Sequence, residues 1–88
     1  MRVIKELILR DIVGEHILVP YGKAALSIKG MINLSESAAV LWQALETERS
    51  EDELVRLLLD NYEVDEQTAR ADVHQFTEKM LEMGIIEL

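Results

Sequence analysis

The sequence lacks cysteine altogether and has only one proline, four glycines and one tryptophan among its 88 residues. Without cysteine there is no disulfide, thiolate metal site or thiol nucleophile, so packing alone must hold the fold together. Long apolar runs are also missing, and Glu6 and Arg10 interrupt the first apolar stretch before a signal peptide could form. We therefore expect a cytoplasmic protein.

Positive charge is scarce. Nine Lys and Arg residues stand against 17 Asp and Glu residues, which gives a net charge of −8. Residues 1–34 carry five basic and three acidic groups (+2), whereas residues 35–88 carry four basic and fourteen acidic groups (−10). Nucleic-acid binding depends on cations that neutralise phosphates, so this charge disfavours DNA and RNA as partners. At this length we expect residues 1–88 to form one domain with a modest core.

The first third of the chain has the pattern of a small β-sheet. Gly14, Gly22 and Gly30 separate segments rich in Ile, Leu and Val at eight-residue intervals, which predicts a three-stranded antiparallel meander. Pro20 has no amide donor and belongs at a strand end or on an edge. The first turn is expected at Gly14-Glu15, and a bulge or break at Gly30. The expected strands are about Ile8–Val13, His16–Tyr21 and Ala25–Leu34.

Near Ser35 the hydrophobic period changes from two to 3.6, which indicates that helices follow. Ser35 is the expected N-cap of a first helix that ends near Glu46. Ser50 and Glu53 form a capping box for a second helix, and a third helix runs from Asp65 to a C-terminal stop at Gly84. The fold class is thus α+β and winged-helix-like, a three-stranded antiparallel meander followed by a three-helix bundle. The expected core comprises Ile32, Leu34, Leu41, Trp42, Leu45, Leu54, Leu58, Val73 and Phe76.

Residues suited to catalysis or metal binding are sparse. His16 and His74 are the only imidazoles, and neither has a second histidine at metal-ligand spacing. No nucleophile elbow, phosphate-binding loop or dinucleotide fingerprint is present. The many carboxylates fit a solvated face, and Met31, Met80 and Met83 fit core packing better than a binding surface. We therefore predict a protein that is not an enzyme and that has no catalytic residue, metal or cofactor.

An extended peptide is the ligand that this architecture suits. The expected third helix, residues 65–82, carries five acids against Arg70 and Lys79, unlike a helix that reads DNA. An open three-stranded meander, in contrast, leaves one edge strand with unpaired amides and carbonyls. An incoming peptide strand satisfies these groups by β-augmentation.

An ordered series of residues runs from about position 7 to the C-terminus. The series consists of Gly14-Glu15, Leu18-Val19-Pro20, Leu34-Ser35-Glu36-Ser37-Ala38-Ala39 with Leu41-Trp42, Ser50 with Glu53-Leu54, Tyr62, Val64-Asp65, Ala69, Asp72-Val73, Phe76 and Gly84-Ile85. Together these residues resemble the PqqD family, with Ser35 standing where many members have asparagine.

The resemblance implies a non-catalytic peptide chaperone. Such a domain binds the leader of a ribosomally made precursor peptide and presents it to a modifying enzyme, often a radical S-adenosylmethionine enzyme, with no nucleic acid or membrane involved. The leader would add as a strand to the third strand and lie against the third helix. The implied peptide-binding residues here are Lys29, Gly30, Met31, Ile32 and Asn33 on the strand, and Arg70, Val73, His74, Thr77 and Leu81 on the helix.

Two other readings stay open at this point. One is a winged-helix protein-interaction or regulatory module, for which DNA binding is disfavoured by the acidic third helix. The other is a small enzyme, which lacks any evident nucleophile or cofactor motif.

Overall fold

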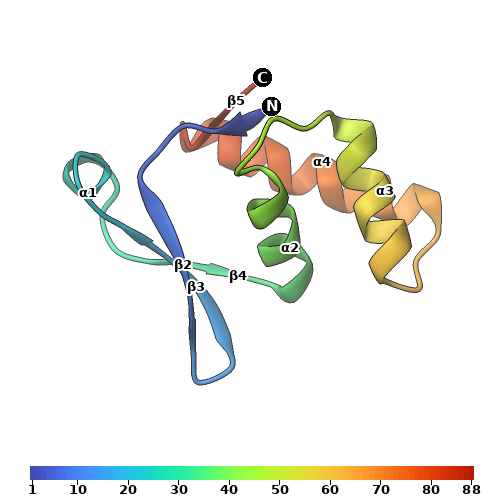
Figure 1. Ribbon diagram of the computed structural model, residues 1–88, viewed down its shortest axis with the longest axis horizontal. Coiled ribbons are helices and arrows are strands. Elements are labelled where there is room, and N and C mark those ends of the chain that lie inside the picture. The colour runs from blue at the N-terminus through green and yellow to red at the C-terminus, as the bar shows by residue number, and fades with distance from the viewer.

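A computed structural model describes residues 1–88 and contains a three-stranded antiparallel sheet with strand order β2-β3-β4 (Figure 1). The strands are β2 (Leu7–Ile12), β3 (Glu15–Pro20) and β4 (Ile32–Leu34). Strand β3 is central, so β2 and β4 are both edges. The expected meander is confirmed, although β2 and β3 each lie one residue earlier than the sequence pattern indicated.

The turn between β2 and β3 is Val13-Gly14, with φ of +52° and +79°, rather than Gly14-Glu15. Positive φ at both central residues of a two-residue turn matches the right-handed twist of the strands. In such a hairpin the flanking pair, here Ile12 and Glu15, is hydrogen-bonded, and bonded pairs then alternate along the ladder. The bond from the Tyr21 amide to the Glu6 carbonyl, at 3.0 Å, fits this alternation.

Side chains alternate between the two faces of the sheet. The inner face carries Leu7 and Leu18, which belong to the main hydrophobic core. We call the opposite side the outer face. It carries the intervening residues of the two longer strands, namely Ile8, Arg10, Ile12, Glu15, Ile17 and Val19.

The expected third strand, Ala25–Leu34, is wrong in its first part. Residues Ala24–Ser27 form a one-turn helix, α1, and only Ile32–Leu34 form a strand. The ladder positions explain this. The pairing Leu18 with Ile32 would continue to Pro20 with Gly30, but Pro20 has no amide to donate. The chain instead turns at Gly22 (φ +57°), where an added Cβ would lie 2.4 Å from the Glu6 carboxylate.

Three longer helices follow, α2 (Glu36–Ala44), α3 (Glu51–Asn61) and α4 (Glu66–Glu82). Their expected starts are confirmed because each is set by a local cap. Ser35 accepts from the Ala38 amide at 3.1 Å, and Asp65 from the Thr68 amide at 2.7 Å. The capping box of Ser50 and Glu53 is complete. Gly84 (φ +68°) ends α4, with the Ile85 amide bonded to the Met80 carbonyl.

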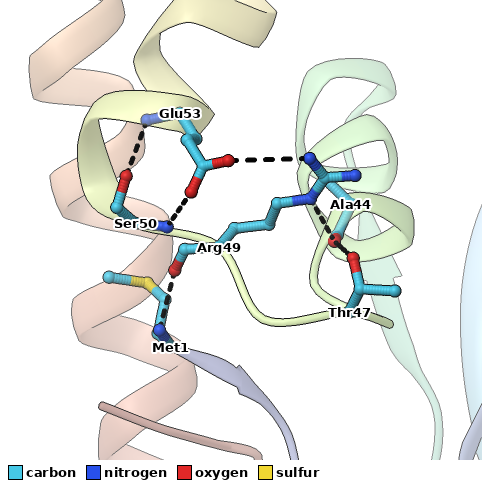
Figure 2. A network of polar contacts seen from close by, with 6 residues as sticks. All are labelled: Met1, Ala44, Thr47, Arg49, Ser50 and Glu53. Carbon is cyan, nitrogen blue, oxygen red and sulfur yellow. Dashed lines mark hydrogen bonds and ion pairs between the residues drawn. The ribbon is translucent and has the colours of Figure 1, made fainter.

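The two ends of the chain meet in a small second sheet that the sequence analysis missed. Strand β1 (Arg2–Val3) pairs antiparallel with β5 (Ile86–Glu87), and the N and C labels lie close together in Figure 1. Figure 2 shows how this end is attached to the link between α2 and α3. The carbonyl of Arg49 accepts a hydrogen bond from the Met1 nitrogen at 2.7 Å. The Arg49 side chain donates to the Ala44 carbonyl and forms an ion pair with Glu53.

The core lies where α2 packs between the sheet and the α3–α4 pair (Figure 1). Seven of the nine expected core residues are buried, including Trp42 at 2% exposure, while Ile32 and Leu34 are half-buried against the same cluster. Seven further residues complete the cluster, among them Leu18, Met80 and Ile85. None of the helices combines the length and apolar character that crossing a bilayer requires.

Replacing the one tryptophan should therefore be costly. We expect Trp42→Ala to lower the free energy of unfolding by about 3–5 kcal/mol because it leaves a cavity in the core. Urea denaturation followed by circular dichroism measures this. The control Leu26→Ala, at a side chain that is 84% exposed, should change stability by less than about 0.5 kcal/mol. Equal effects of the two variants would contradict the described packing.

The helix caps predict acid sensitivity. Bonds from the Ser50 amide and hydroxyl hold the pKa of Glu53 below its usual 4.5, and bonds from the Thr68 amide and hydroxyl hold the pKa of Asp65 below its usual 3.8. Because both pKa values are lower in the folded state, this stabilisation is complete above the unfolded-state pKa values and is lost as the pH falls through the folded ones.

Stability should thus decline below about pH 4, where carboxylates begin to protonate. The double variant Glu53→Gln, Asp65→Asn keeps polar caps but cannot titrate, so its unfolding free energy should fall less steeply with pH. Urea denaturation across the acid range compares the two proteins. Identical slopes would mean that these caps do not contribute.

Candidate functional site

The edge of β4 that faces away from β3 is open. Since Ile12 and Glu15 form a bonded pair, the odd-numbered residues of β3 point their backbone groups toward β2 and the even-numbered ones toward β4. Ile32, opposite Leu18, therefore bonds to β3. The amide and carbonyl of Asn33 point outward and can pair with another strand.

A groove of about 320 Å³ lies beside this edge. Strand β4, the start of α2 and one face of α4 form its walls. Its floor is apolar and built from Leu34, Ala38, Leu41, Phe76 and Met80. Leu41, Phe76 and Met80 are buried in the core, so the floor is rigid, whereas Ala38 is small and leaves space above it.

Polar residues surround the floor, namely Asn33, Ser35, Ser37, Asp72, Gln75 and Lys79. Asp72 and Lys79 take part in none of the ion pairs of the structure, so both charges are available to a ligand. The rim thus has one acid and one base, unlike the strongly acidic body around it. A groove with an apolar floor, a polar rim and an open strand edge is suited to an extended peptide.

The structure places only part of the expected site at this groove. Of the strand set, Ile32 and Asn33 are in β4, and Asn33 lines the groove; Lys29, Gly30 and Met31 precede the strand, with Gly30 at φ +83°. None of the expected helix residues lines it. Val73 and Thr77 are buried, and Arg70 contacts Asp52 of α3 at 3.1 Å. His74 pairs with Glu78, and Leu81 is partly exposed elsewhere on α4.

The difference is a matter of which flank of α4 borders the groove. Successive helix residues are rotated by about 100°, so the buried stripe through Phe76 has a polar flank on each side. The expected residues lie on one flank and on the buried stripe itself. The groove is lined by the other flank, Asp72, Gln75 and Lys79.

Among the expected site residues, only Asn33 lines this groove. The signal available in the sequence was the buried stripe of α4 and the N-cap at Ser35, both of which were identified. Neither shows which flank of the stripe borders the open edge of β4. That depends on the direction in which α4 crosses α2, which is a tertiary property.

The open edge, the groove and the three-helix body together define a small winged-helix-like binding domain. The chain belongs to the family described as "Coenzyme PQQ synthesis protein D (PqqD)", which matches residues 15–86. This confirms the family resemblance found in the sequence. No curated protein matches the chain.

Two solved structures share the fold. One is described as "TbiB1 in Complex with the TbiA(beta) Leader Peptide"; its TM-score is 0.75 at 20% identity, covering 99% of this chain and 95% of that chain. The other is described as "Lasso peptide synthetase B1 complexed with the leader peptide". Its TM-score is 0.71 at 20% identity, and the match covers 96% of this chain and 93% of that chain. At this identity the two structures establish the winged-helix-like α+β fold.

The alternation along β4 makes adjacent residues respond differently to proline. Ile32→Pro removes a donor from the protein's own ladder and should destabilise the fold by about 1–3 kcal/mol more than Ile32→Ala, because the partner carbonyl loses its bond. Asn33→Pro removes an outward donor and should cost less than about 1 kcal/mol relative to Asn33→Ala. Urea denaturation of the four variants tests this. The reverse order would show that the assigned alternation is wrong.

Proposed function

We propose that this chain is a non-catalytic peptide chaperone that binds the leader of a ribosomally made precursor peptide and presents it to a modifying enzyme. The observation that carries this proposal is the open edge of β4 next to a groove with an apolar floor. Family membership and the two leader-peptide complexes of the same fold support it. In this proposal the bond-making chemistry belongs to the partner enzyme, of the radical S-adenosylmethionine or another peptide-modifying class.

The leader would lie along β4 as a fourth strand. Asn33 offers one amide and one carbonyl to it, and Met31, two residues earlier, offers a second pair if its backbone is extended. These backbone bonds contribute about 1 kcal/mol each. Micromolar binding is a net free energy of about −8 kcal/mol, so the contacts must supply that amount and also offset the entropy cost of association. Apolar side chains of the leader in the groove must supply the larger part.

The ten residues implied by the family resemblance divide under this proposal. Met31 and Asn33 remain proposed backbone contacts, with Lys29, Gly30 and Ile32 forming the segment that holds them. Val73 and Thr77 support the groove from within the core. We propose Asp72, Gln75 and Lys79 as the side-chain contacts on α4 in place of Arg70, His74 and Leu81.

Blocking the groove should prevent leader binding. Ala38→Phe adds a large side chain above the floor while removing no core contact, so it should weaken binding at least tenfold, or by about 1.4 kcal/mol. The control Ala25→Phe makes the same change at an exposed alanine of α1 and should have no effect. The measurement is fluorescence anisotropy with a labelled synthetic leader of a short precursor encoded beside this gene.

Strand addition at β4 is tested separately. Asn33→Pro should weaken binding of the same labelled leader by about tenfold, because it removes one backbone bond and its ring obstructs the incoming strand. Asn33→Ala keeps the amide and should bind nearly normally. Asp11→Pro, an outward position on the opposite edge strand β2, is the second control. Unchanged binding by a folded Asn33→Pro protein would remove β4 as the site of addition.

A further inference from the structure

The tip of the β2–β3 hairpin holds a residue that the fold does not favour. Val13 has φ of +52°, a backbone conformation that β-branched residues rarely adopt, and its side chain is 98% exposed. Asparagine or glycine would fit this turn without strain. Burial cannot account for a valine here, because almost none of its surface is covered. Backbone strain of this kind is commonly found at functional positions.

Val13 is continuous with other exposed aliphatic groups on the outer face of the sheet. Ile8 and Ile12 are 39% and 47% exposed, whereas Ile17, between them and β4, is buried at 7% exposure. Ile8, Ile12 and Val13 stay exposed, and Figure 1 shows the hairpin pointing away from the helices. Arg10 lies in the same row and takes part in none of the ion pairs of the structure.

This surface is separate from the groove. Strand β2 and β4 are opposite edges of the sheet, and neither Val13 nor Ile8 lines the groove. A leader added to β4 would therefore leave the outer face of the hairpin accessible. The chain can then hold a peptide at one edge and a protein at the other.

We propose that the outer face of the hairpin, ending in Val13, is the docking surface for the peptide-modifying enzyme. The inference rests on the proposed function, since it identifies the surface at which the enzyme that receives the leader would bind. The enzyme would contribute an apolar patch with a carboxylate placed opposite Arg10. A second copy of this chain is a poorer occupant, because two bodies of net charge −8 repel each other.

The turn offers a variant with opposite effects on folding and docking. Val13→Asn relieves the strain, so its melting temperature should rise, yet it removes the aliphatic tip and should weaken enzyme binding at least tenfold. Leu26→Asn, at another highly exposed aliphatic residue on α1, is the matched control and should leave enzyme binding unchanged. Arg10→Glu tests the charge without touching the turn and should also weaken binding at least tenfold.

The probe is the purified modifying enzyme encoded beside this gene, titrated by isothermal calorimetry against each variant with and without leader. Leader affinity of the variants should equal that of the unmodified protein. Unchanged enzyme binding by both Val13→Asn and Arg10→Glu would overturn the proposal, as would an equal loss in Leu26→Asn. A dimer of the unmodified protein that Val13→Asn dissociates in sedimentation equilibrium would assign the face to a second copy instead. Failure of the unmodified protein to bind leader would contradict the proposed function alone.

Discussion

The two-residue turn at Val13-Gly14 determines the hydrogen-bond alternation of the whole three-stranded sheet. Because it makes Ile12 and Glu15 a bonded pair, it decides which backbone groups of β3 are left for β4. As a result, the backbone amide and carbonyl of Ile32 point toward β3, and those of Asn33 point away from the sheet. A turn one residue longer would reverse the alternation and point the groups of Ile32 outward. The chemistry of an edge strand on one side of the molecule is thus fixed by a turn on the other.

The same alternation explains the short length of β4. Pro20 occupies an even-numbered position of β3, where its missing amide faces β4 and not β2. The ladder therefore ends after Leu18 and Ile32, and the chain leaves the sheet through α1. Few outward backbone groups remain on so short a strand, so the backbone alone cannot provide strong or selective binding. In the proposed mode of binding, selectivity would come from side chains of the leader that enter the groove between β4 and α4.

Local signals in the sequence were sufficient for the helices. Ser35, Ser50 and Asp65 each cap a helix with their own side chain and need no distant partner, so the helix starts could be predicted from the residues alone. The stop at Gly84 is local for the same reason. The burial of Trp42 followed from the helical spacing of its apolar neighbours.

Properties that depend on a distant partner were harder to predict. Leu26 and Ile28 alternate as strand residues would, but the missing amide of Pro20 prevents the pairing that would make them a strand. Strand β1 is two residues long and forms only because β5, from the other end of the chain, lies beside it. The flank of α4 that borders the groove depends on how the helices cross, and both flanks are polar in the sequence.

Strand addition would couple the two proposed surfaces through the sheet itself. A leader paired with β4 would place alternate side chains in the groove and the remaining ones on the outer face, next to Asn33 and Ile17. An enzyme docked on that face would then contact side chains of both this chain and the leader. Its affinity would rise when the leader is bound, and by thermodynamic linkage the leader would bind more tightly to the docked complex. A single extended sheet is thus sufficient for the partner to distinguish the loaded protein from the empty one.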